Sequence, residues 1–467
     1  MMTIILRELH DSIKSFGFAV LLLLSITLFL INALVFIPRY RDALKEYSQR
    51  ITFLHSVRST RTMGARKHPG PLMFLAEGGQ SYLTKEYWIY PGGKIEPWPY
   101  HTPPETSAMP DVPELDWTFI ITGVFSLYAL FLGYNALSGE RERGTLRLIM
   151  SNPCARTRIL AAKYCSIFIM LLIPLFAGVS LNLGFISSTM PKVLSTAPLA
   201  AYPILLLAVV AYLSLFIFLS LLVSSVEKES SVSLLVLLLV WVVFTIIPDM
   251  SGIIADKIHG GGSEYTLAKT SITSERYEIW GELKTALQTR IDRGDLKTEE
   301  EINKAYTSEV IKIVREIARN RQAYEQFLVR KADVSRMMSR ISPMALFRNA
   351  AEAIAGTGDG GEENFMRDMK RFSWEYDRYI EKKLGTVIPD SEAGGITVRF
   401  GGKEIAMTPP EPREFDGNKS DFPVFRESVS SLPRILSDSL PDLSGLLLWN
   451  LVLAMGAFLS FNRADVR

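Results

Sequence analysis

Six stretches of the chain consist almost entirely of apolar residues, and polar segments of very different length separate them. A membrane-spanning helix needs about 20 mostly apolar residues to cross a hydrocarbon core roughly 30 Å thick. The approximate bounds of these stretches are residues 18–36, 117–137, 159–186, 199–223, 232–247 and 443–461. We therefore predict an all-α polytopic membrane protein with six transmembrane helices. The first stretch is too long for a cleaved signal peptide, and no small-residue cleavage pattern follows it.

The polar segments divide the chain into parts of different character. The predicted parts are an interfacial helix with the first span (1–37), a first extracytoplasmic segment (38–115), spans two to five (116–248), a second extracytoplasmic segment (249–441), and the last span with its tail (442–467).

The short loops indicate the orientation, because cytoplasmic loops carry an excess of Lys and Arg. The loop between spans two and three contains five arginines, whereas the loop between spans three and four contains only Lys192. The first of these loops is therefore predicted to be cytoplasmic, with both termini on the same side. This orientation gives a multi-pass protein with its two long segments outside the cytoplasm.

The first long segment begins with a helical stretch, 43–57, that continues span one outward. It then becomes rich in Pro and Gly, which favours loops and a few strands. Its aromatic residues near prolines suit either a ligand groove or packing against the second long segment; these are Trp88, Trp98 and Tyr100.

The second long segment is predicted to be mainly helical. Apolar residues from Tyr277 to Ile291 recur at helical spacing, and Thr298 with Glu301 forms a capping box that starts another helix toward Met338. Together these two helices form a long helical hairpin. Residues 395–407 alternate around two glycines and predict a β-hairpin. An amphipathic helix over 425–436 is expected to meet span six.

Composition narrows the function classes. The chain is 48% hydrophobic and 21% charged, and its net charge of +2 is too small and scattered for nucleic-acid binding. Neither Cys154 nor Cys165 falls in a long polar segment, which excludes a disulfide framework there. The five histidines have no paired ligand spacing. A group of methionines fits either cuprous-ion binding or helix packing: Met337, Met338, Met344, Met366 and Met369.

The chain carries no energy-coupling chemistry of its own. Ionisable residues are absent from the span interiors, which argues against a proton relay, and Lys163 is expected to snorkel to the cytoplasmic surface. Two Gly-Gly-Lys triplets, at 92–94 and 401–403, do not continue as a P-loop and are interpreted as tight turns. We therefore predict no enzyme activity, no bound cofactor and no metal site.

The loop after span two is the most informative segment. Residues 138–147 are strongly charged, Gly144 permits a sharp change of direction, and Thr145 can cap the helical residues after it. A surface helix over 138–150 would present four charged side chains to the cytosol: Glu140, Arg141, Glu142 and Arg143. The same charges also fit a plain membrane-surface linker.

This loop resembles a known family. The pattern Gly139-Glu140-x-Glu142-x-Gly144-Thr145-Leu146, then Ser151-x-Pro153-x-x-Arg156, then Lys163 is similar to the loop after span two of ABC-2 family permeases. The resemblance is strongest to the subgroup of multicopper-enzyme-maturation and gliding-motility transporters. It implies that the loop is the coupling helix that docks into a separate ATPase subunit. The implied docking residues are Glu140, Arg141, Glu142, Arg143, Gly144, Thr145 and Leu146, while Pro153 and Arg156 would set the re-entry of span three.

Both ends of the chain extend the resemblance. Residues 5–15 are similar to the interfacial helix that precedes span one, and the tail ends in Asp465-Val466-Arg467 as in the subgroup. Asn135 departs from the acidic residue that the family often has. The resemblance implies the permease subunit of an ABC exporter, with ATP and Mg²⁺ on a partner ATPase, a second permease copy or paralogue, membrane lipid and an extracytoplasmic protein as partners. The bacterial cytoplasmic (inner) membrane as its location is implied by the same resemblance.

Other functions stay open on the sequence. The same subunit would also suit a mechanotransmitter that moves an extracytoplasmic partner without transporting a substrate. A membrane-anchored scaffold or receptor, whose outer helical segment binds a partner without an ATPase, is an alternative from another class. A membrane enzyme with an outer catalytic segment finds no support in any catalytic or metal constellation. The sequence names neither the cargo nor the partner permease.

Overall fold

The structure is a computed structural model of the whole chain. It describes residues 6, 8–10, 13–58, 62–78, 85–90, 93–98, 115–146, 155–196, 201–258, 280–310, 312, 334–384, 396–407, 422–428 and 431–463. The two long polar segments are called the first insert (38–115) and the second insert (249–441).

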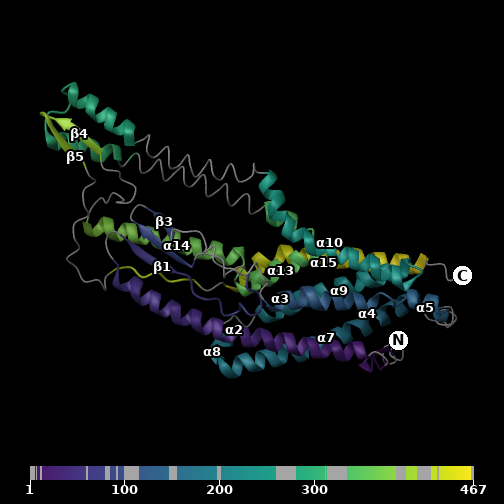
Figure 1. The fold of residues 1–467 in the computed structure, drawn as a ribbon. Coiled ribbons are helices and arrows are strands. Elements are labelled where there is room, and N and C mark those ends of the chain that lie inside the picture. Colours follow the sequence, from purple (N-terminus) through teal and green to yellow (C-terminus); the bar gives the residue numbers. More distant parts are fainter. Residues whose placement is uncertain are drawn as a thin grey trace.

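Six helical segments have the length and apolar composition of membrane spans within the described residues, which confirms the predicted fold class. They are α2 (Phe16–Ser56), the second span made of α3 (Trp117–Phe119), η1 (Ile120–Phe125) and α4 (Ser126–Gly133), then α7 (Arg156–Thr189), α9 (Ala201–Val226), α10 (Ser230–Ile258) and α15 (Leu432–Arg463). Short α8 (Pro191–Thr196) follows α7. The start of α2, the end of α15 and α5 lie at one end of the bundle, here called the α5 end (Figure 1). The inserts lie toward the opposite end, the insert end.

The first helix continues far beyond its apolar part, as predicted. At a rise of 1.5 Å per residue, a helix of the 41 residues of α2 is about 60 Å long, twice the thickness of a hydrocarbon core. The helix runs through Pro38 without a break. Its distal half contacts the first strand of the first insert, so one continuous helix joins the bundle to that insert (Figure 1).

The centre of the bundle is α9, which has the largest buried share of any candidate span. It packs against α15, α4, α7 and also α13 (Pro343–Ala355), a helix of the second insert. The Tyr212 ring of α9 lies 4.8 Å from the Phe347 ring of α13, centroid to centroid. Apolar packing between α13 and the spans therefore fixes the second insert directly on the membrane bundle.

The first insert contains an antiparallel sheet in the order β1 (Met63–Arg66), β2 (Glu86–Tyr90), β3 (Lys94–Trp98). One face packs against α14 (Asp359–Leu384) of the second insert, where the rings of Tyr87 and Phe365 are 5.7 Å apart. The other face meets α2, where a Cβ at Gly64 would overlap Leu54. Trp88 pairs with Gly64 and so belongs to this second face. The sheet is thus held between α2 and α14.

The described parts of the second insert confirm two local predictions. Helix 280–292 ends in a turn at Gly294, with a φ of 75°. The hydroxyl of Thr298 accepts a hydrogen bond from the Glu301 backbone at 3.2 Å as the next helix begins. Strands β4 (Ile396–Phe400) and β5 (Lys403–Met407) form the predicted hairpin and pack on these helices. Tyr277 and most of the predicted second hairpin helix, residues 313–333, lie outside the described residues.

The prediction of a helix over 425–436 is wrong in its first part, because residues 422–428 are not helical and α15 begins at Leu432. Tertiary contacts fix the extended course: the Phe425 ring lies 5.6 Å from both Phe365 and Phe372 of α14. The backbone and hydroxyl of Ser428 also donate to Asp368, at 2.8 and 2.5 Å.

The methionine group is spread over different environments. Met344 is buried in the core of the bundle, whereas Met369 is buried in the core between the sheet and α14. Met337 is exposed. These positions favour the packing interpretation for the two buried residues.

Candidate functional site

The loop after span two contains the short helix α5 (Ser138–Glu142). The predicted change of direction comes directly after it, since Gly144 has a φ of 69°, a backbone conformation that favours glycine. Residues 147–154, which include Pro153, lie outside the described residues. The described loop is therefore a short helix and a turn, followed by the buried side chain of Leu146.

The start of α5 is held by the end of α9. The hydroxyl oxygen of Ser224 accepts hydrogen bonds from the backbone N–H groups of Leu137 and Ser138, at 3.0 and 3.1 Å. The first N–H groups of a helix have no carbonyl partner within that helix, and here the Ser224 hydroxyl of α9 accepts their hydrogen bonds. The arrangement fixes α5 to α9 at a buried position.

Lys163 of α7 forms a buried ion-pair cluster with α5. Its ammonium lies 2.7 Å from the Glu140 carboxylate and 3.1 Å from that of Glu8, and its side chain is only 6% exposed. The predictions that Lys163 snorkels and that Glu140 faces the cytosol are therefore wrong. A charge removed from water must be paired, and two carboxylates that approach from different segments offset the cost of burying this amine.

Arg141 also faces the protein rather than solvent. Its guanidinium donates to the backbone carbonyls of Ser225 at 3.0 Å and of Glu227 at 2.7 Å, where α9 ends. The last carbonyls of a helix have no partners within the helix and carry partial negative charge. Arg141 therefore caps the C-terminal end of α9.

Glu142 makes the complementary contact with the next span. Its carboxylate accepts hydrogen bonds from the backbone N–H of Ser230 at 2.6 Å and from the Ser230 hydroxyl at 2.9 Å, where α10 begins. A carboxylate is favoured at a helix N-terminus by the same dipole argument. Consecutive residues of α5 thus hold the end of α9 and the start of α10.

Four consecutive residues form the exposed end of this loop, here called the α5 tip: Glu142, Arg143, Gly144 and Thr145. The Arg143 side chain donates back to the Gly139 carbonyl at 3.0 Å, and the Thr145 hydroxyl donates to the Glu140 carbonyl at 3.2 Å. These bonds hold the turn in shape while its surface stays accessible. The Thr145 hydroxyl thus bonds to α5, which precedes it, whereas it was expected to cap the residues after it.

Arg156, at the start of α7, contacts the other end of the chain. Its guanidinium donates to the carbonyls of Phe461 at 3.1 Å and Asn462 at 2.6 Å, in the last turn of α15. The re-entry of span three is therefore tied to the C-terminal end of span six.

Sequence reasoning missed a second polar cluster, at the insert end. The Asn32 amide of α2 donates to the carbonyls of Phe74 at 3.1 Å and Leu115 at 2.6 Å. Asn182 of α7 donates to the side-chain oxygen of Asn32 at 2.8 Å and accepts from the Trp117 indole at 3.2 Å. The only sequence signal is an asparagine inside each of two apolar runs. The cluster joins two spans to the first insert.

The fold and these contacts define a class. A bundle of six apolar spans with a braced loop at one end and two large inserts at the other is a polytopic membrane protein. The chain matches the family model described as ABC-2 family transporter protein over residues 2–466, and it belongs to this family. It is thus a permease component of an ABC transporter, a family whose members work with a cytoplasmic ATPase component and are not themselves catalytic. No match was found among the curated proteins.

Proposed function

We propose that this permease couples ATP hydrolysis by a separate cytoplasmic ATPase subunit to export, or to the movement of an extracytoplasmic partner. In this proposal the α5 end faces the cytoplasm of a bacterial cell and the inserts lie outside. The arginines around α5 support this orientation, because cytoplasmic loops are enriched in Arg and Lys. ATP and Mg²⁺ would bind the partner subunit.

The observation that carries the proposal is the bonding of α5. Behind the exposed tip, Glu140 contacts α7 through Lys163 and Arg141 contacts the end of α9. Glu142, within the tip, contacts the start of α10. A force applied to the tip by a docked ATPase would therefore reach three spans through short, charge-assisted bonds. A plain linker would need none of these bonds.

We assign docking to the α5 tip and force transfer to Glu140 and Arg141. This division refines the docking segment that the family resemblance implies, because a side chain bonded inside the bundle is not available to a partner. Leu146 is buried and is therefore not part of the accessible tip. The proposal also includes a second permease copy or paralogue in the complex. It further includes membership of the subgroup of multicopper-enzyme-maturation and gliding-motility transporters.

A pull-down from mild detergent tests it. The tagged wild type should retain an ATP-hydrolysing subunit, and Arg143→Glu at the tip should lose it. The matched control is Lys14→Glu, which makes the same charge change at an exposed position of the same end of the bundle. Thermal unfolding of each variant checks that the bundle is intact.

The pull-down has three informative outcomes. Loss with Arg143→Glu and retention with Lys14→Glu support docking at the tip. Retention in both variants contradicts the docking assignment. If the wild type itself retains no ATPase, the scaffold or receptor function is favoured, and the second insert becomes the segment to examine for a partner.

A further inference from the structure

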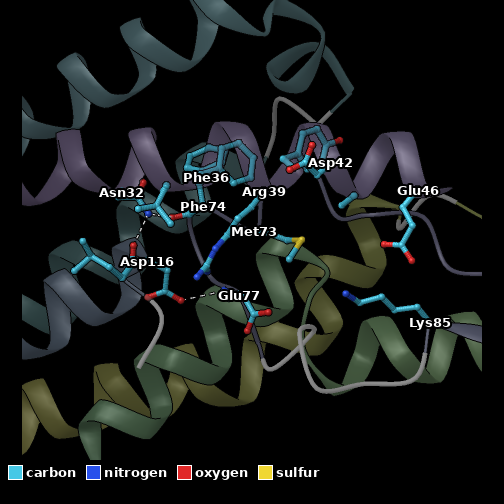
Figure 2. A pocket seen from close by; sticks show the side chains of 14 residues that line it. Asn32, Phe36, Arg39, Asp42, Glu46, Met73, Phe74, Glu77, Lys85 and Asp116 are labelled. Atoms are coloured by element: carbon cyan, nitrogen blue, oxygen red, sulfur yellow. Dashed lines mark hydrogen bonds between the residues drawn. The ribbon is translucent and has the colours of Figure 1, made fainter. Parts of the chain in front are cut away.

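A cavity of about 600 Å³ lies beside α2 where the helix leaves the apolar part of the bundle. Its walls come from α2 between Asn32 and Glu46, from residues 73–77 and 85 of the first insert, and from residues 115–116 before α3 (Figure 2). This volume is within the range of about 300–1,000 Å³ that is usual for small-molecule sites. The cavity is separate from α5, which lies at the other end of the bundle (Figure 1).

The lining of the cavity changes from apolar to charged along α2. Near Asn32 it contains the apolar residues Val35, Phe36, Phe74 and Leu115. Toward Glu46 it carries charges of both signs, from Asp42, Lys85 and Glu46, whereas Arg39, Glu77 and Asp116 lie nearer the Asn32 end (Figure 2). A ligand that fits both halves has an apolar part and a charged head, and is therefore an amphiphile.

Two of these charges are available to a ligand. Arg39, Glu77 and Asp116 have partners in the protein. In the part of the chain that the structure describes, Lys85 and Asp42 have no ion-pair partner. They come from different walls, α2 for Asp42 and the residue before β2 for Lys85 (Figure 2). Opposite charges on facing walls suit a head that itself carries both signs.

The apolar half of the cavity opens toward the lipid-facing surface of the bundle. Val35 lines the cavity and is also exposed, and it continues an exposed apolar row on α2 with Ile31 and Leu34. This row lies in the membrane-spanning part of the helix. An acyl chain lying along the row would place its head group at the charged half.

We propose that this cavity binds a membrane lipid with a zwitterionic head of one phosphate and one primary ammonium, the phosphatidylethanolamine class. The phosphate pairs with Lys85, and the ammonium pairs with Asp42, one helical turn before Glu46. Glu46 also bonds Arg66 at 2.6 Å, which holds its carboxylate at this wall. The excess of carboxylates over cations disfavours a head that is only anionic, because like charges repel.

The test measures lipid binding by the full-length protein in detergent, by native mass spectrometry. The probe is lysophosphatidylethanolamine, compared with lysophosphatidylglycerol and with soluble phosphoethanolamine. We expect the first to bind most tightly. Since the proposed contacts are charge-assisted hydrogen bonds, Asp42→Asn with Lys85→Gln should weaken it by about tenfold or more. The control is Lys45→Gln, an exposed residue of α2 that does not line the cavity.

A second variant tests the apolar entrance without changing any charge. Val35→Trp narrows the cavity from the lipid side and should also weaken binding of lysophosphatidylethanolamine. Equal binding of lysophosphatidylglycerol would overturn the zwitterionic assignment, and equal binding of phosphoethanolamine would overturn the lipid assignment. Equal weakening by Lys45→Gln, or full binding by both cavity variants, would overturn the site.

Discussion

The ammonium of Lys163 lies 2.7 Å from the carboxylate of Glu140, and this contact joins α7 to the loop proposed to receive an ATPase. The two residues are 23 positions apart in sequence, and Glu8 approaches the same ammonium from the N-terminal segment at 3.1 Å. A charge reversal at Glu140 would therefore disturb the bundle itself. A loss of ATPase binding in such a variant would not identify the docking surface.

The first prediction concerns this ion pair. Lys163→Met leaves two carboxylates without their cation, and breaking a buried pair costs about 3–5 kcal/mol. Glu140→Gln leaves Lys163 its contact with Glu8 and should cost less. Thermal unfolding in detergent should rank the variants in that order, and the double variant should be more stable than Lys163→Met alone. A double variant that is less stable than Lys163→Met would contradict a paired cluster.

The second prediction concerns the turn at the α5 tip. Gly144 has a φ of 69°, and a Cβ there would meet no neighbouring atom, so Gly144→Ala changes only the backbone preference. The left-handed conformation costs an alanine about 1–2 kcal/mol. Amide hydrogen exchange at residues 143–146 should therefore accelerate about fivefold or more. Gly281→Ala, with equal space and no left-handed backbone, is the control and should leave exchange in its own helix unchanged or slower.

The third prediction compares two glycines of α7. A Cβ at Gly178 would overlap the Phe29 ring and lie 2.8 Å from the Ser25 hydroxyl of α2, whereas a Cβ at Gly184 would meet nothing within 4 Å. Gly178→Ala should destabilise the bundle by about 1–3 kcal/mol, the usual cost of overpacking. Gly184→Ala should be neutral or slightly stabilising. Equal unfolding temperatures for the two variants would show that α2 and α7 do not approach each other this closely.

The fourth prediction concerns pH. Burial raises the pKa of Glu352 in α13 from 4.5 to about 7, aided by the acidic residues Asp359, Asp116 and Glu77 and opposed by Arg348. A raised pKa means that the folded state binds the proton more tightly than the unfolded chain. The stability from this group is thus present below about pH 4.5 and is lost as the pH rises toward 7.

Glu352→Gln should remove this dependence, since the amide stays neutral throughout. Unfolding temperatures between pH 5 and 8 should fall less steeply for the variant than for the wild type, and the variant should be the more stable at pH 8. Parallel curves for the two proteins would contradict a raised pKa of Glu352 in the folded state. Glu282→Gln, on the exposed surface of helix 280–292, is the matched control and should follow the wild type.

The sequence predicted local structure well wherever one segment determines its own form. Long apolar runs identified the spans, and Gly401 and Gly402, with φ of 58° and 80°, marked the tight turn of the β4–β5 hairpin. Lys163 was misjudged because its environment depends on Glu8 and Glu140, which only tertiary packing brings near. The helix prediction at Phe425 was wrong for the same reason. Helical spacing describes a segment by itself, whereas the aromatic contacts of Phe425 with α14 decide the course of its backbone.

For the candidate site, too, the sequence predicted the local structure but not the tertiary contacts. The pattern around Gly139–Leu146 located α5 and its turn, but it did not separate side chains that bond inward from those that stay exposed. Arg141 and Arg143 have the same chemistry and lie two positions apart. Arg141 reaches the carbonyls at the end of α9, whereas Arg143 turns back to the carbonyl of Gly139. That difference depends on where α9 ends, which the loop sequence does not contain.

The unbroken course of α2 through Pro38 has a mechanical consequence. About 20 of its residues extend beyond the apolar part, which corresponds to a rod of about 30 Å. If the helix pivots where this rod begins, a tilt of about 10° displaces its far end by about 5 Å. The sheet of the first insert is packed against this rod and would be carried with it. In such a rotation α2 would act as a lever arm, and a small tilt inside the bundle would become a larger displacement at its far end.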